Sequence, residues 1–235
     1  MLIDLIRSGF STDAVISVLL FIPTILISLT VHEYCHGYAA YLCGDNTAHW
    51  NGRLTLNPIK HLDPIGTIMM LFFGFGYARP VPINPRNFKN YRFGLVFVSL
   101  AGPLSNILLA LIGLLLQYGV LQIVLLQSDQ MIISIFESNL FYMWSLFIYL
   151  FISANAALAV FNLLPIPPLD GSRIVTSFLP AKLAYYYNKY ENYIMLIVLA
   201  LLYLNILDGA IYWLRSGLLT GLEWLVQLIP FTFLK

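Results

Sequence analysis

The chain has 235 residues, of which 60% are hydrophobic and only 10% are charged. Soluble domains carry about 25% charged residues, so the composition excludes an ordinary soluble domain and indicates a membrane protein. The formal net charge is only +1 and no basic helix or basic stripe occurs, which argues against nucleic acid as a partner.

The N-terminal residues do not have the pattern of a cleavable signal peptide. They contain one basic residue, Arg7, and two acidic residues, Asp4 and Asp13. The apolar run that follows leads directly into a charged motif, without a small-residue cleavage site. We therefore expect this run to remain in the protein as its first membrane span.

Four apolar segments are long enough to cross about 30 Å of hydrocarbon as helices. They cover residues 14–42, 93–117, 140–164 and 193–214. A fifth stretch, residues 65–78, has only about 14 residues and suits a re-entrant or interfacial segment better than a span. The stretch 218–233 predicts a segment in the membrane interface, anchored by Trp224. The predicted fold is therefore an all-α polytopic membrane protein.

The distribution of basic residues in the loops predicts the topology. The loop between the first two spans contains Arg53, Lys60, Arg79, Arg86, Lys89 and Arg92, and the loop between the third and fourth spans contains Arg173, Lys182 and Lys189. The loop between the second and third spans has no Lys or Arg. Because basic loops stay in the cytoplasm, we expect the first and third loops inside and the N-terminus outside. No repeat or soluble appended domain is evident, so residues 1–235 are predicted to be one membrane-embedded unit.

The two cysteines, Cys35 and Cys43, are not expected to form a disulfide. On one helix they would lie about 12 Å apart, whereas a disulfide needs Cα atoms within about 7 Å. Two buried thiols are the simpler interpretation.

A metal-binding motif lies near the cytoplasmic end of the first span. The residues are His32, Glu33, Tyr34, Cys35 and His36. On a helix the two histidines project from one face, one turn apart, and can hold one zinc ion. The glutamate can reach a water on the metal, as in the H-E-x-x-H zinc hydrolases. The alternative is a polar cluster that stabilises the bundle, but ionisable groups within a span are costly and usually functional.

Such a site needs a third protein ligand and an open fourth position. The acidic residues on the predicted cytoplasmic side are Asp45, Asp63 and Asp170, while Glu137 and Asp208 lie toward the outside. Asp170 is the best candidate, because three prolines in the sequence NLLPIPPLDG at residues 162–171 end the helix and stiffen the turn before it. Its alternative role is that of a turn or helix-capping residue. His49 and His61 lack a partner at ligand spacing and are expected at a surface or interface.

These motifs resemble the site-2 protease family of intramembrane zinc metalloproteases. Further segments similar to those of this family lie at residues 52–58 (GRLTLNP), 61–66 (HLDPIG), 79–85 (RPVPINP) and 101–106 (AGPLSN). The resemblance covers most of residues 14–174, the predicted core, and thins before the C-terminal helices expected over 190–235. Many relatives carry a PDZ or CBS domain, for which this sequence has no room.

The resemblance implies an enzyme that cuts transmembrane proteins within or beside the lipid bilayer of the plasma membrane. His32, His36 and Asp170 would bind one zinc ion on the cytoplasmic side, with Glu33 as general base. Asn162 would help to hold the substrate or the oxyanion. A membrane-embedded hairpin near residues 65–85 would pair with the unwound substrate as an added strand.

Two other functions are compatible with a zinc site in a membrane protein. One is a catalytically silent zinc-binding adaptor, although a structural site needs no general base such as Glu33. The other is a metal or solute transporter, although transporters usually contain repeated halves and none is evident here.

Overall fold

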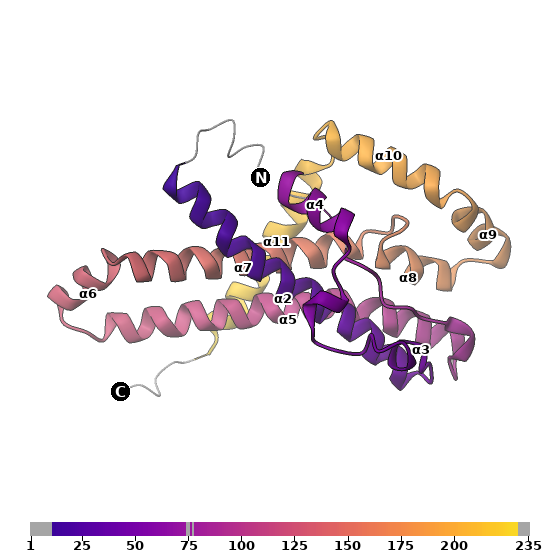
Figure 1. Ribbon diagram of the computed structural model, residues 1–235, viewed down its shortest axis with the longest axis horizontal. Helices are drawn as coiled ribbons and strands as arrows, with labels where there is room; N and C mark the ends of the chain where they lie inside the picture. Colours follow the sequence, from indigo (N-terminus) through magenta and orange to yellow (C-terminus); the bar gives the residue numbers. More distant parts are fainter. Residues whose placement is uncertain (1–10, 74–75, 77, 230–235) are drawn as a thin grey trace.

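The computed structural model describes residues 11–73, 76 and 78–229. Within these residues the α-helices, labelled as in Figure 1, are α2 (Thr12–Leu42), α3 (Thr47–Trp50), α4 (Pro64–Phe73), α5 (Tyr91–Leu125), α6 (Asp129–Phe136), α7 (Asn139–Leu163), α8 (Asp170–Phe178), α9 (Ala181–Lys189), α10 (Glu191–Tyr203) and α11 (Asp208–Gln227). Single 3-10 turns occur at Pro58–Lys60 and Pro85–Asn87. No strand is present in the described part of the chain.

Three long helices form the centre of the molecule. The helices α5 and α7 run antiparallel, with α2 packed across both, and α6 joins α5 to α7 at one end (Figure 1). All three are long and apolar enough to cross a membrane. Ser11, Asn90 and Ser138 cap their N-termini by accepting backbone N–H groups of the first turn. The prediction of an all-α polytopic membrane protein is thus confirmed.

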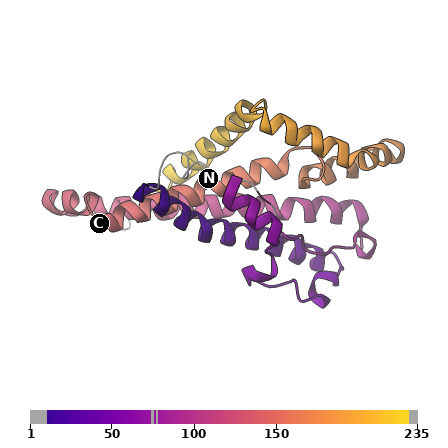
Figure 2. The same ribbon diagram turned by 45° about the horizontal axis from the view of Figure 1, so that its top comes forward.

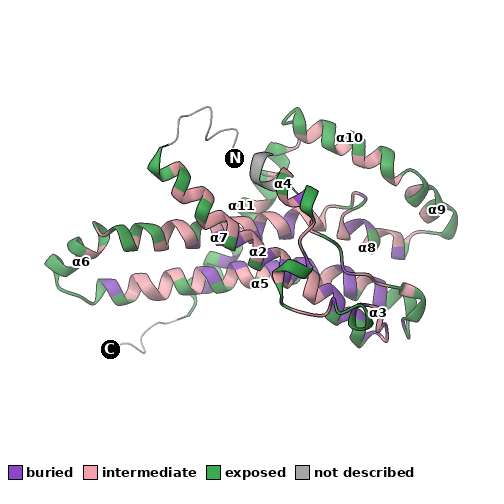
Figure 3. Ribbon diagram, viewed as in Figure 1, coloured by how far each residue is buried: buried purple, intermediate pink, exposed green. Residues whose placement is uncertain are grey.

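Many of the buried residues of this bundle are small or polar, and Figure 3 shows that burial concentrates where the long helices pack together. Thr24 and Ser28 of α2 are fully buried, and their hydroxyls donate to carbonyls one turn earlier in the same helix. Asn106 of α5 and Asn155 of α7 are also fully buried and bond to each other. Small residues allow helices to approach closely, and interhelical hydrogen bonds add to packing where no water competes.

The segment expected to be re-entrant is mainly helical. The ten residues of α4 extend about 15 Å, which is too short to cross the bilayer. A single antiparallel bridge joins Leu62 to Ala78, so the two ends of the segment that contains α4 lie side by side. This arrangement agrees with a re-entrant path. A hairpin of paired strands is not formed in the described residues, because prolines at 80, 82 and 85 lack the N–H groups that a ladder requires.

The connector between α2 and α5, residues 43–90, is fastened by buried polar residues. The Asp45 carboxylate accepts hydrogen bonds from the backbone N–H of Asn84 and from the side chains of Thr47 and Asn87. The guanidinium of Arg53 donates to the carbonyl of Arg79 at 2.7 Å. These contacts hold the extended segment 79–84 against the C-terminal half of α2.

The predicted fourth span over residues 193–214 is not one continuous helix. It is divided into α10 and α11, whose axes differ by 87°. Asn205 has a φ of 58°, in the left-handed region that asparagine tolerates well. The N–H groups of Asn205 and Ile206 bond to the carbonyls of Leu202 and Leu201, which is the Schellman ending of a helix.

The stretch 218–233, which is expected in the membrane interface, is not an element of its own in the described residues. The chain from Leu218 to Gln227 continues α11, which packs against α7 and α5. Leu222 and Val226 are buried in that contact, whereas Trp224 is exposed. Figure 2 shows α9 and α10 along the flank of the bundle opposite α2 and α3.

Candidate metal centre

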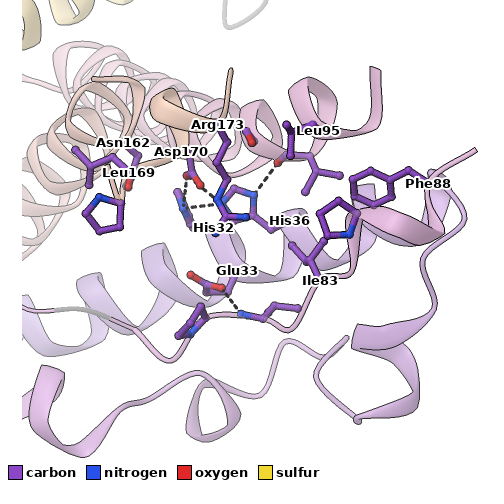
Figure 4. A pocket seen from close by; sticks show the side chains of 16 residues that line it. His32, Glu33, His36, Ile83, Phe88, Leu95, Asn162, Leu169, Asp170 and Arg173 are labelled. Atoms are coloured by element: carbon purple, nitrogen blue, oxygen red, sulfur yellow. Dashed lines mark hydrogen bonds and ion pairs between the residues drawn. The ribbon is translucent and has the colours of Figure 1, made fainter. Parts of the chain in front are cut away.

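Three side chains from two distant parts of the chain meet at one point. The Nε2 atoms of His32 and His36 lie 3.0 Å apart. The Oδ2 atom of Asp170 lies 3.3 Å from Nε2 of His32 and 3.0 Å from Nε2 of His36. Among the described residues, these three form the one group of His, Cys, Asp or Glu atoms close enough to share a metal ion. Figure 4 shows all three side chains converging.

The donor set fits zinc. Ligands about 2.1 Å from a tetrahedral zinc ion stand about 3.4 Å from one another, close to the separations of the three atoms. Two imidazoles and one carboxylate are a ligand set that catalytic zinc sites use, with a fourth position left open. Both histidines are buried, whereas the Asp170 side chain is 18% exposed.

The opposite ring nitrogens of both histidines bond to α5. His32 Nδ1 lies 2.6 Å from Oδ1 of Asn106, and His36 Nδ1 lies 2.7 Å from the carbonyl oxygen of Val98. Gly102 lies between these two contacts, and a Cβ there would be 2.3 Å from Nε2 of His36. The glycine therefore lets α5 approach the two rings.

The turn before α8 positions Asp170. Helix α7 ends at Leu163, and Pro165, Pro167 and Pro168 exclude a continuous helix into α8. Gly171 packs directly on the end of α7, because a Cβ there would be 2.3 Å from the carbonyl oxygen of Leu163. Burial alone would raise the pKa of the Asp170 carboxyl, but hydrogen bonds and charge from His32 and His36 outweigh it and hold the pKa well below its ordinary value.

Glu33 lies beside the two histidines on α2, against the connector. Its Oε2 accepts a hydrogen bond of 2.8 Å from the backbone N–H of Val81. This contact joins the extended segment 79–84 to the helix that carries the histidines (Figure 4). A carboxylate held this way can accept a proton from a water in the adjacent cavity.

A cavity of about 350 Å³ opens over these residues. Its wall includes Glu33, Val81, Asn162 and Arg173 besides the three metal-ligand candidates (Figure 4). The Asn162 Nδ2 group donates to the carbonyl of Leu158 at 3.0 Å, which leaves its second N–H hydrogen available.

The other candidate acids lie elsewhere. Asp45 is occupied in the connector, Asp63 caps α4 by accepting from the N–H groups of Ile65 and Gly66, and Asp208 lies in the first turn of α11. Glu137 ends α6. None of them belongs to the cluster at the histidines within the described residues.

The remaining histidines and both cysteines are outside the cluster as well. His49 is exposed, as expected, but His61 is buried, and its Nε2 bonds to the carbonyl of Thr55. The surface prediction for His61 is wrong because the connector folds over it. Both cysteines are free, which confirms that they do not pair.

Sequence reasoning missed two contacts of the site. Asn106 belongs to the AGPLSN motif, and a polar amide within an apolar span is a usable signal for such a contact. The bond from Val81 to Glu33 had no local signal, because the two residues are 48 positions apart.

Comparison with known proteins gives a consistent result. The model of peptidase family M50 matches residues 20–205. YwhC of Bacillus subtilis, named as a candidate zinc metalloprotease, is 44% identical over 191 residues, which are 81% of this chain and 82% of that protein. The proteins named Rip2, also as candidate zinc metalloproteases, are more distant. That of Mycolicibacterium smegmatis is 31% identical over 62% of this chain and 52% of its own length, and that of Mycobacterium tuberculosis is 28% identical over 80% and 70%. No solved structure matches.

Proposed function

This chain belongs to peptidase family M50, the site-2 protease family, and on that premise we propose that it is an intramembrane zinc endopeptidase that cuts transmembrane proteins. The family makes it a metalloprotease with zinc as its cofactor and peptides as its substrates. The observation that carries the finer proposal is the convergence of His32, His36 and Asp170 inside a bundle of membrane-spanning helices.

In this proposal, His32, His36 and Asp170 hold the zinc ion. When bound, zinc supplies Lewis acidity, which polarises a carbonyl and makes water a better nucleophile near neutral pH. The buried rings and the carboxylate fix the ion at one depth. At about 1.5 Å per residue, His36 lies about 9 Å before the end of α2 at Leu42. Cleavage would thus take place below the membrane surface.

Glu33 is assigned the role of general base. It takes a proton from the attacking water and returns it to the leaving amine. Its contact with the Val81 N–H holds the carboxylate beside the histidines rather than toward lipid. Asn162 is assigned to the substrate or to the oxyanion, because its free N–H hydrogen lies in the wall of the same cavity.

The segment 79–84 is the proposed docking edge for the substrate. Substrate helices hide their carbonyls in internal hydrogen bonds and must unwind before cleavage. Within the described residues, the N–H of Ile83 and the carbonyl of Val81 have no hydrogen-bond partner, and both residues line the cavity. An extended peptide could pair with them as an added strand.

Cross-linking tests this docking edge. A photoreactive residue at Val81 should capture a bound substrate, whereas the same residue at Trp50, which is 76% exposed and outside the cavity, should not. Equal capture at both positions, or repeated absence of capture at Val81, would count against the docking edge. Tyr77, a second candidate position, lies outside the described residues.

We also propose that the active site faces the cytoplasm of a plasma membrane. The basic connector and the cavity lie toward the end of the bundle opposite α6 (Figure 1), so the positive-inside rule puts this end in the cytoplasm. The chain would act as one peptidase unit, with a core over residues 14–174 and the C-terminal helices packed on it. A membrane-impermeant probe that reaches a cysteine at Lys60 only from the outside would overturn this orientation.

The decisive experiment is cleavage of a transmembrane peptide by the purified protein in liposomes. Glu33→Gln should retain one zinc ion per chain but lose cleavage by about 10²- to 10⁴-fold, the usual contribution of a general base. Glu223→Gln, an exposed glutamate of α11, is the matched control and should cleave normally. Full cleavage by Glu33→Gln would remove its assigned role. A wild type that binds zinc but cleaves no peptide would favour a silent adaptor, and zinc uptake into the liposomes would favour a transporter.

A further inference from the structure

Asn106 contacts His32 in the most enclosed part of the bundle. The His32 Nδ1 atom lies 2.6 Å from the Asn106 Oδ1 atom. The exposed fraction of His32 is 5% and that of Asn106 is 0%. Water is thus excluded from this hydrogen bond, and loss of either group would leave the other unpaired.

The remaining contacts of Asn106 fix which way its amide points. Its Nδ2 group donates to the carbonyl of Ser28 at 3.3 Å and to Oδ1 of Asn155 at 2.8 Å. The Ser28 carbonyl can only accept, so the NH₂ end must face it and the oxygen end must face His32. His32 must then be the donor through Nδ1–H, which leaves the Nε2 lone pair for the metal.

The orientation of the Asn155 amide on α7 is fixed in the same way. Its Nδ2 group donates to the carbonyl of Phe151 at 2.8 Å, so its oxygen is the end that faces Asn106. The path Phe151–Asn155–Asn106–His32 is therefore a chain of hydrogen bonds with one direction. It connects the helix before Asp170 to the ring of a second candidate ligand through buried side chains.

His36 provides the contrast. Its Nδ1 bonds to a backbone carbonyl, that of Val98, which no side-chain substitution at that position removes. Its orientation thus follows from the path of α5 alone. The orientation of His32 depends on one side chain.

We infer that Asn106 is the positioning residue of the metal centre: it selects the Nδ1–H tautomer of His32 and fixes the ring so that Nε2 faces the ion. This role rests on the proposed zinc site. Partners in this position commonly raise metal affinity about 10- to 100-fold. This role also accounts for an asparagine in the AGPLSN motif, because close packing of the helices does not by itself require a polar residue there.

Zinc affinity, measured by competition with a chromophoric chelator, tests the inference. Asn106→Leu should bind zinc about 10- to 100-fold more weakly than wild type. Asn106→Asp keeps an acceptor for His32 and should restore most of the affinity. The matched control is Thr24→Val, which removes a fully buried hydroxyl of α2 that bonds only within its own helix, and it should leave zinc affinity unchanged.

The outcomes separate this role from the zinc site itself. Tight zinc binding by wild type and equally by Asn106→Leu would overturn the inference alone. A wild type that binds no zinc would overturn the zinc site and this role with it.

A measurement on the wild-type protein tests the inference without relying on correct folding of the variants. The ¹⁵N spectrum of histidine-labelled, zinc-loaded wild type should contain a His32 with a protonated Nδ1 and a metal-bound Nε2. A His32 ring bound to zinc through Nδ1, or unprotonated there, would overturn the inference.

Discussion

The core helices α2, α5 and α7 and the C-terminal helices α9 to α11 differ in what they bury. The core buries Asn106, Asn155, His32 and His36, each in contact with another buried group. In contrast, α9 and α10 bury no described residue, and α11 buries only Leu222 and Val226. The core helices are also the longer ones, with 25 to 35 residues against 9 to 20, and the burial of partnered polar groups separates the two regions further.

The physical reason is that a polar group buried away from water is costly unless it has a partner. A helix can hold several such groups only where neighbouring helices supply partners. The core does so through three mutually packed helices. From the C-terminal helices, Arg215 donates to the hydroxyl of Ser153 at 3.3 Å, and the Tyr187 hydroxyl donates to the carbonyl of Pro165 at 2.6 Å. Residues of the same type should therefore behave differently in the two regions.

The largest difference is expected between two aspartates. Asp170→Ala removes one of the three proposed ligands. Loss of a residue that only hydrogen-bonds to a ligand lowers metal affinity up to about 100-fold, so loss of the ligand itself should lower zinc affinity further. Asp208→Ala, in the first turn of α11 and outside the cluster, should bind zinc like wild type. Zinc per purified chain measures both. If Asp170→Ala retains zinc, or Asp208→Ala loses it, the ligand set is wrong.

Two glycines provide the next comparison. Gly102→Ala places a Cβ 2.3 Å from Nε2 of His36, so it should displace the ring, weaken zinc binding at least tenfold and destabilise the protein by about 1–3 kcal/mol. Gly217→Ala in α11 meets nothing within 4 Å and should be neutral or slightly stabilising. Thermal unfolding in detergent, with and without a chelator, measures both. Similar unfolding temperatures for the two variants would remove the distinction between the regions.

Two asparagines test the catalytic role of the cavity wall. If its amide holds the oxyanion, Asn162→Ala should leave zinc binding unchanged and lower the rate of cleavage about 10- to 100-fold. This loss is at or below the one measured when other enzymes lose an oxyanion donor. The effect should fall on kcat more than on KM. Asn188→Ala, exposed on α9, serves as the control. An unchanged kcat for Asn162→Ala would make its side chain a structural group at the end of α7.

The smallest expected effect is a pH dependence of the connector. Burial raises the pKa of Asp45, but hydrogen bonds from Thr47, Asn84 and Asn87 outweigh it and lower the pKa below its ordinary value. The stability that this carboxylate gives the connector is therefore complete above the ordinary pKa of about 4 and is lost as pH falls through the lowered value.

Hydrogen exchange of residues 79–89 measures this effect. Protection should fall at low pH in wild type, and Asp45→Asn should remove that dependence and reduce protection at neutral pH. Asp129→Asn, exposed at the start of α6, is the control. Unchanged exchange in Asp45→Asn would show that the connector is held by other contacts.

Much of the fold and of the candidate site could be predicted because the signals are local. The spacing of His32 and His36 is one helical turn, and their shared face follows from helix geometry. The three prolines after α7 predict a stiff turn before Asp170. The bend at Asn205 was also locally encoded, by an asparagine followed by Asp208-Gly209, but a continuous apolar run concealed it.

The sequence by itself determined that this protein crosses membranes as helices, that two histidines share a helix face and that a carboxylate follows a stiff turn. These properties depend on composition and on spacings of a few residues. Only the tertiary structure decided that Asp170 reaches the histidines, that Val81 binds Glu33 and that Asn106 orients His32. Those contacts join residues 48 to 138 positions apart, and such pairs meet only when α2, α5 and α7 have packed together.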